Sequence, residues 1–195
     1  MKCMKKSHYK NLSNYEILKM NFINKKKIFD GKNIQVFNYK FEKNEKEIQH
    51  EIIEQGGISC VLAIDEDEVI MVKQFRYPFD QVLEIPAGNI EKSETSEECA
   101  RRELLEETGY STTQLTHLIR FYPSLGYNLQ FVDCYLATKL EKKSKQKLDD
   151  DEFVSVHKIP IKELFSLIKS GKIIDPKTLC ALSMMLQKND LNFKT

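Results

Sequence analysis

The stretch GNIEKSETSEECARRELLEETGY, residues 88–110, decides how this chain folds and which chemistry it can perform. Glu103, Glu106 and Glu107 are spaced by three and four residues, so a helix gathers their carboxylates on one face within about one turn. Each like-charged pair at this spacing destabilises an isolated helix by roughly a few tenths of a kcal/mol, unless divalent cations sit among the oxygens. Mg²⁺ prefers hard oxygen ligands and is usually held by one or two carboxylates plus substrate phosphates. The stretch therefore predicts a magnesium site for a phosphate-containing substrate.

The same stretch carries the signals of a helix with defined ends. Thr95 and Glu98 form a capping-box pair at its start, and Gly109 supplies a left-handed stop. Ala100 and Leu104 make a short apolar stripe that packs inward, so the acidic face is expected to point outward.

Two more charged residues belong to the predicted site. The polar loop 88–94 lets Glu94 fold back toward the carboxylates, and Arg102 can orient one of them through a charge-assisted pair. The alternative is a solvated glutamate-rich helix, which is what most acidic helical faces are. The spacing favours the metal site.

These residues resemble the Nudix box, the signature of hydrolases that act on nucleoside diphosphates linked to another group. The defining positions are matched by Gly88, Glu94, Arg102, Glu103, Leu104, Glu106, Glu107 and Gly109. Tyr110 departs from the aliphatic residue that is usual at the last position. The resemblance implies an α+β fold, an α/β/α sandwich with a mixed sheet. It also implies that Glu103, Glu106 and Glu107 bind the metal, and that Glu106 and Arg102 take part in catalysis.

Over about residues 31–187 the chain also resembles the ADP-ribose pyrophosphatase branch of that family. The resemblance is carried by QFRY at residues 74–77 and LEIPAG at residues 83–88. In that branch, the corresponding residues imply substrate contacts for Arg76 and Glu84 and a backbone metal ligand at Ala87. A guanidinium suits a diphosphate because its fork can hold two oxygens at once. A surface ion pair with a neighbouring carboxylate is the alternative for Arg76.

Two departures from the branch bear on the substrate. Leu125 stands in YPSLG, residues 122–126, where the ADP-ribose group has a second proline, and residues 128–130 are Asn, Leu and Gln where many relatives have an acid. The expected reaction is cleavage of ADP-ribose, or a related nucleoside diphosphate sugar, to a nucleoside monophosphate and a sugar phosphate. The alternatives are another substrate (GDP-mannose, a dinucleoside polyphosphate or an oxidised nucleotide) and a nucleotide-sugar-binding module without catalysis.

The mechanism also needs a base that deprotonates a metal-bound water. In the ADP-ribose relatives the base comes from a loop well beyond the box, and the acidic run at residues 149–152 occupies the corresponding stretch. We assign this role to Glu152, with Asp151 as the second choice and a solvated loop as the alternative. The expected cofactor is Mg²⁺, for which Mn²⁺ can substitute.

Composition fits a compact enzyme. With 195 residues, 41% of them hydrophobic, and a net charge of +1, nothing points to a nucleic-acid or membrane partner. No apolar run is long enough to span a bilayer, and the five scattered cysteines are read as reduced thiols, so a cytoplasmic location is expected. Residues 1–30 are predicted to be a basic segment, helical or loose, ahead of one Nudix domain at 31–195. The branch implies a homodimer built by swapped amino-terminal strands, acting on a small-molecule nucleotide.

Hydrophobic periodicity predicts the remaining elements. Strands at 33–41 and 48–54 form an amino-terminal β-hairpin around a charged turn, and the apolar run 58–64 is a strand buried on both faces. Further strands are predicted at 69–75, 82–85, 115–122, 131–137 and 153–159, and helices at 161–170 and 176–187.

Overall fold

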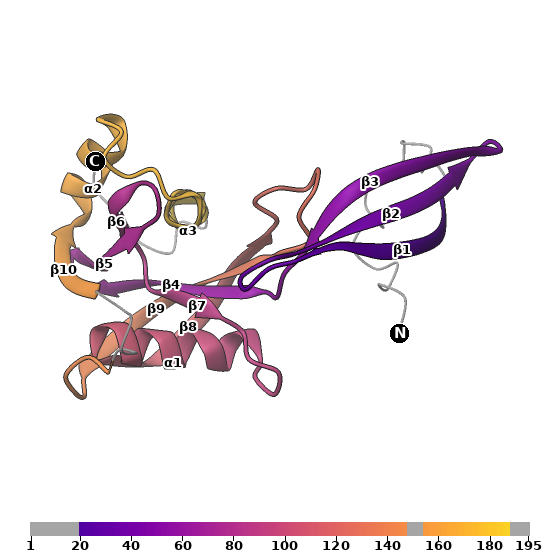
Figure 1. Cartoon of the computed structure of the whole chain (residues 1–195). Coiled ribbons are helices and arrows are strands. Elements are labelled where there is room, and N and C mark those ends of the chain that lie inside the picture. The colour runs from indigo at the N-terminus through magenta and orange to yellow at the C-terminus, as the bar shows by residue number, and fades with distance from the viewer. Residues whose placement is uncertain (1–19, 148–153, 188–195) are drawn as a thin grey trace. The chain divides into compact units, whose positions relative to one another are not determined.

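The computed structural model describes residues 20–147 and 154–187 (Figure 1). The chain divides into two compact units, one ending at Ile52 and the other beginning at Ile53. No helix in the described ranges is long and apolar enough to cross a membrane.

The amino-terminal unit is a three-stranded sheet in the order β1–β2–β3. Its strands are β1 (Asn21–Asp30), β2 (Gln35–Lys43) and β3 (Lys46–Glu54). Asn44 and Glu45, between β2 and β3, both have positive φ, 49° and 62°, which is the backbone of a two-residue type I′ hairpin turn. The predicted hairpin is confirmed, with a tighter turn than expected.

The prediction that the first thirty residues are helical or loose is wrong for Asn21–Asp30. These residues form β1 and pair with β2 from Asn21 opposite Glu42 to Asp30 opposite Gln35. Two lysines of this strand lie over an aromatic ring of the next one: the ammonium groups of Lys25 and Lys27 are 4.5 and 5.8 Å from the ring centroid of Phe37. Residues 1–19 lie outside the described residues.

The second unit is built on a seven-stranded mixed sheet. The central order is β10–β5–β4–β9–β8, with β6 paired to β5 and β7 paired to β4. The bounds are β4 (Ile58–Asp65), β5 (Glu68–Arg76), β6 (Asp80–Glu84), β7 (Ala87–Asn89), β8 (Tyr110–Phe121), β9 (Val132–Lys142) and β10 (Val154–Pro160). Strands β4 and β9 run parallel, and the other pairs with a described register are antiparallel.

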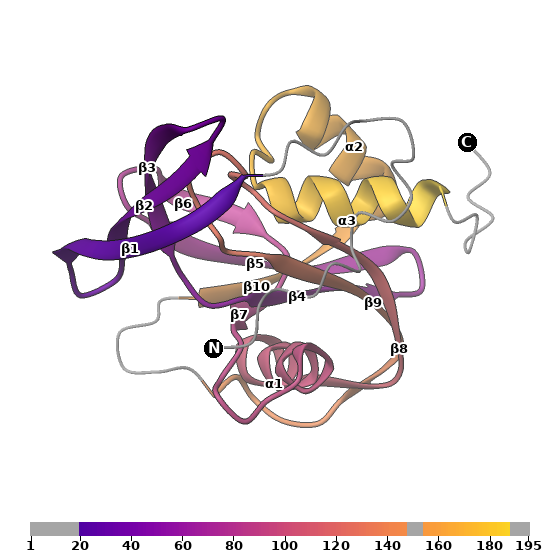
Figure 2. The same cartoon turned by 90° about the vertical axis from the view of Figure 1, so that its right-hand side faces the viewer.

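Helices cover both faces of this sheet (Figure 2). Helix α1 (Ser96–Thr108) lies on one face, and α2 (Ile161–Lys169) and α3 (Pro176–Gln187) lie on the other. Leu62 of β4 packs in the core with α2 and α3, whereas its neighbours Val61 and Ala63 pack with α1. The continuous apolar run of β4 is explained by this double burial, and the predicted sandwich is confirmed.

Strands β8 and β9 extend furthest beyond the bounds that the apolar pattern predicted. Strand β8 begins at Tyr110, directly after Gly109, because the left-handed conformation of that glycine turns the chain from the helix straight into the sheet. Strand β9 continues to Lys142, which pairs with Tyr110, so the start of the predicted charged connection is strand. Charged residues are tolerated there because Lys139, Glu141 and Lys142 are exposed.

Candidate active site

Helix α1 has the ends that its sequence predicts. The Thr95 hydroxyl accepts a hydrogen bond from the Glu98 amide at 3.2 Å, and a Glu98 carboxylate oxygen accepts one from the Thr95 amide at 2.8 Å. Gly109 closes the helix with φ of 73°, and its amide donates to the Leu105 carbonyl. The reciprocal cap fixes the first turn, so the acidic positions further along are held in a defined register.

The carboxylates of α1 do not all face solvent as expected. Glu103 is 9% exposed and Glu107 is 3% exposed, whereas the Glu106 side chain remains 38% exposed. The expectation that the acidic face points outward is therefore wrong for Glu103 and Glu107. The segment that includes β7 covers them: the Ala87 amide donates to Glu107 Oε2 at 3.1 Å. This hydrogen bond offsets part of the hydration that the Glu107 carboxylate loses on burial.

Gly88 makes this covering possible. A Cβ atom at position 88 would lie 1.7 Å from Glu103 Oε1, far inside van der Waals contact. The requirement for glycine at this position comes from the close approach of the backbone to Glu103. The sequence identified Gly88 as a box position, but its reason is visible only in the folded chain.

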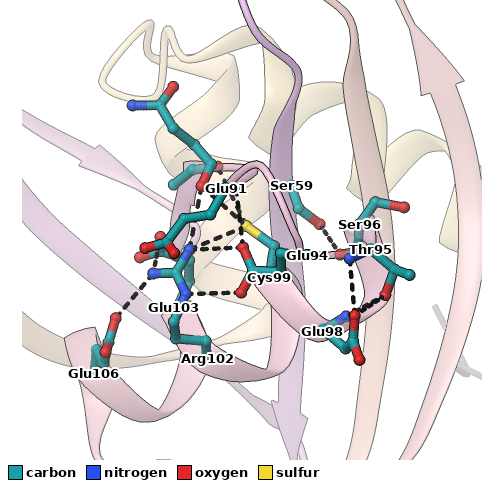
Figure 3. A network of polar contacts seen from close by, with 12 residues as sticks. Ser59, Glu91, Glu94, Thr95, Ser96, Glu98, Cys99, Arg102, Glu103 and Glu106 are labelled. Carbon is teal, nitrogen blue, oxygen red and sulfur yellow. Dashed lines mark hydrogen bonds and ion pairs between the residues drawn. The ribbon is translucent and has the colours of Figure 1, made fainter.

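Arg102 joins three carboxylates (Figure 3). Its Nε and Nη2 atoms donate to the two oxygens of Glu94 at 2.8 and 3.0 Å, and Nη1 donates to Glu103 Oε1 at 2.7 Å and Glu106 Oε2 at 2.9 Å. The predicted return of Glu94 toward the cluster is confirmed. The Arg102 guanidinium holds the pKa of Glu94 below its usual range, and the carboxylates, Glu94 foremost, raise the pKa of Arg102.

This donor set suits a divalent cation. Three glutamates offer hard oxygens within one helical turn, and the Ala87 backbone lies against one of them. Arg102 contacts Glu94, Glu103 and Glu106. In residues 20–147 and 154–187, no group of three His, Cys, Asp or Glu side chains is arranged to enclose an ion. Glu103 and Glu106 meet at Arg102 Nη1, and Glu107 meets the Ala87 amide; that these four residues hold a metal stays a prediction.

Arg76 and Glu84 form an ion pair across β5 and β6. Arg76 Nε lies 2.8 Å from Glu84 Oε1, and Nη2 lies 3.2 Å from Oε2. The Glu84 side chain is 3% exposed, whereas that of Arg76 is 45% exposed. Burial acts to lower the pKa of Arg76, but Glu84 and, more weakly, Glu107 raise it overall. The attraction from Glu107 connects this pair with the carboxylates of α1.

Sequence reasoning missed two residues of this ion-pair network. Lys177 Nζ contacts Glu84 Oε2 and lies 2.9 Å from Asp175 Oδ1. The order Asp, Pro, Lys, Thr at 175–178 is typical of a helix start, so Asp175 could have been found as a cap. No local signal could have indicated the contact between Lys177 and Glu84, which are 93 residues apart.

The remaining predicted positions are the candidate base and the loop that departs from the ADP-ribose branch. Asp151 and Glu152, the candidates for the base, lie outside the described residues. In the loop that departs from the ADP-ribose branch, Leu125 is 75% exposed. Asn128 donates to Gln55 at 2.8 Å and accepts from the Gln130 amide at 2.8 Å, so amides hold the loop where relatives have an acid.

Comparison with known proteins agrees with this geometry. The NUDIX domain family matches residues 54–182, which is more than half of the chain, and the protein belongs to that family. It is a Nudix hydrolase, and hydrolases of this family generally use divalent metal ions.

Individual relatives support the same assignment. The chain is 40% identical over 173 residues to a protein of Bacillus subtilis named ADP-ribose pyrophosphatase, covering 87% of this chain and 94% of that protein. It is 38% identical over 149 residues to the methanol dehydrogenase activator of Bacillus methanolicus, covering 75% and 80%. The crystal structure of an ADP compounds hydrolase superposes with a TM-score of 0.78 at 19% identity, covering 87% of this chain and 94% of that one, which shows the shared fold.

Replacing Gly88 by alanine tests the close contact with Glu103. The added methyl group must displace Glu103 or shift β7, so we expect hydrolysis to fall about a hundredfold and stability by roughly 1–3 kcal/mol. Gly56→Ala is the matched control, because a Cβ atom at position 56 meets nothing within 4 Å. Turnover and urea unfolding measured on both variants decide the point; equal behaviour of the two would contradict the steric role of Gly88.

Proposed function

We propose that this Nudix hydrolase cleaves the diphosphate linkage of ADP-ribose, or of a closely related nucleoside diphosphate sugar, with Mg²⁺ as its metal. The products are a nucleoside monophosphate and a sugar phosphate. The observation that carries the proposal is the half-exposed Arg76, held by the buried Glu84 and attracted by Glu107 of the box helix. The relative named ADP-ribose pyrophosphatase, at 40% identity, supports the same substrate class.

The charge distribution of the site suits a diphosphate. The α1 carboxylates cannot attract an anion by themselves, so a cation held by them would be needed to attract the phosphate groups. Arg76 offers an exposed guanidinium, already oriented through Nε and Nη2, whose remaining N–H groups can donate to phosphate oxygens. A substrate with two adjacent phosphates can use both the cation and Arg76.

Each protein group has a distinct task in the proposed mechanism. Glu103, Glu106, Glu107 and the Ala87 carbonyl would hold Mg²⁺, which would supply Lewis-acid chemistry: a lower pKa for water and neutralisation of charge on the leaving phosphate. Arg102 orients Glu103 and Glu106 through Nη1 and is anchored by Glu94 on its other edge. Glu152 would take the proton from the attacking water.

The position of β10 supports the choice of base. Val154 begins β10 and pairs with Gln74, two residues before Arg76 on β5. Glu152 precedes Val154 by two residues in the sequence. The strand that follows the acidic run in the sequence therefore pairs with the strand that carries Arg76.

The proposal includes a cytoplasmic homodimer acting on a small-molecule nucleotide. The amino-terminal sheet exposes large apolar side chains, among them Phe22 at 48% and Phe29 at 53%. Apolar surface of this kind is typical of a protein interface. Sedimentation that finds only a 22.8 kDa species would reject the dimer.

A substrate panel tests the function. Purified protein is incubated with ADP-ribose, GDP-mannose, a diadenosine polyphosphate and 8-oxo-dGTP, each with and without Mg²⁺, and the products are separated by chromatography. We expect AMP and ribose 5-phosphate from ADP-ribose, only in the presence of metal. Faster cleavage of another compound reassigns the substrate, and binding without any product favours the non-catalytic module.

Glu106→Gln and Glu107→Gln test the metal site. Loss of a carboxylate ligand should lower turnover about a hundredfold or more, because the water and the leaving phosphate lose their cation. Glu163→Gln on the exposed face of α2 is the control, since it removes the same charge away from the site. The metal assignment is wrong if both box variants match the control at saturating Mg²⁺.

Glu152→Gln tests the base. Replacing a general base by its amide should reduce kcat about a hundredfold while the thermal unfolding midpoint stays unchanged. Asp151→Asn, measured in parallel, shows whether the neighbouring acid carries the role. Near-normal kcat in the Glu152 variant removes that residue from the mechanism.

A further inference from the structure

Lys177, at the start of α3, contacts the partner of the substrate arginine. Its Nζ atom reaches Glu84 Oε2 and lies 2.9 Å from Asp175 Oδ1. The Lys177 side chain is only 12% exposed, and the Glu84 side chain only 3%. Charges of alternating sign thus run from Asp175 through Lys177 and Glu84 to Arg76.

The docking of α3 does not explain this lysine. Asp175 Oδ2 accepts hydrogen bonds from the Thr178 amide and hydroxyl at 2.9 and 2.5 Å, and the Ile85 amide donates to the Thr178 hydroxyl at 3.0 Å. These contacts cap the helix and fasten it to the chain beside Glu84 without Lys177. A buried ion pair is often no more stabilising than an apolar side chain of similar volume, so the charge of Lys177 calls for another explanation.

That explanation lies in the two oxygens of Glu84. Oε1 accepts from Arg76 Nε at 2.8 Å, and Oε2 accepts from Arg76 Nη2 at 3.2 Å as well as from Lys177. Arg76 is 45% exposed, so packing alone does not fix its guanidinium; the Glu84 carboxylate does. Burial acts to raise the pKa of Glu84, yet Arg76 and Lys177 together leave it below its usual range, which keeps the carboxylate charged.

We propose that Lys177 is a positioning residue, which holds the Glu84 carboxylate in the orientation that aims Arg76 at the diphosphate of the substrate. The inference rests on the proposed function and deepens it. Lys177 touches neither substrate nor metal in this role. It acts on substrate affinity through Glu84 and Arg76, and the hydrolytic step itself belongs to the carboxylates of α1.

Kinetics of four proteins test the proposal: wild type, Lys177→Met, Arg76→Ala and the double variant. For Lys177→Met we expect KM for ADP-ribose to rise about tenfold while kcat stays within about twofold, because ground-state positioning is lost and the chemical step is kept. Lys172→Met is the matched control, since it removes an exposed lysine a few residues before α3. Its KM should equal that of the wild type.

The double variant separates positioning from an independent role. If Lys177 acts through Arg76, the KM of the double variant should be at most about twofold higher than that of Arg76→Ala. The proposal is overturned if the two substitutions have independent effects that multiply in the KM of the double variant. It is also overturned if Lys177→Met leaves KM unchanged or lowers kcat alone. Circular dichroism checks the fold of each variant, and Lys177→Gln, which keeps an N–H donor without the charge, replaces Lys177→Met if that variant does not fold.

Calorimetric titration with ADP and Mg²⁺ makes the result independent of turnover. The dissociation constant of ADP should rise about tenfold in Lys177→Met. In the double variant it should stay within about twofold of the value for Arg76→Ala. Absence of wild-type turnover on the substrate panel contradicts the proposed function, whereas equal ADP affinity of wild type and Lys177→Met contradicts the role of Lys177.

Discussion

The close contact between the backbone at Gly88 and the carboxylate of Glu103 is the constraint on which the candidate site depends. It leaves no space for a Cβ atom, and it allows Ala87 and Gly88 to lie directly against Glu107 and Glu103 of α1. Two acids that helical periodicity would place in solvent are thereby buried. Burial in low dielectric strengthens the interaction of these acids with a cation, which is what phosphate chemistry requires.

The same segment is held from the opposite face of the sheet. The Ile85 amide donates to Thr178 of α3, and the Ala87 amide donates to Glu107 of α1, so helices from both layers hold two residues that are separated only by Pro86. Each helix also contributes charge: α1 supplies the carboxylates, and α3 supplies the ammonium that meets Glu84. The sandwich therefore brings the carboxylates of α1 and the ion pair of Arg76 with Glu84 to one short stretch of chain.

Much of this arrangement could be predicted, because it is encoded by neighbours in sequence. The reciprocal cap of Thr95 with Glu98 and the return of Glu94 to Arg102 depend on spacings of three and eight residues. The burial of β4 could be predicted from its unbroken apolar run. Strand β1 could not be predicted, because Lys25 and Lys27 gain partners from aromatic rings on β2, whereas local composition suggests a solvated segment.

The sequence by itself determined the family, the helix with its caps, and the set of carboxylates, since each follows from residue type at fixed local spacing. Only the tertiary structure decided which of those acids are buried and why Gly88 must be glycine. It also decided that Lys177 meets Glu84 across 93 residues. The physical reason is that burial and long-range ion pairs depend on which elements pack together, and no local pattern of residues specifies that packing.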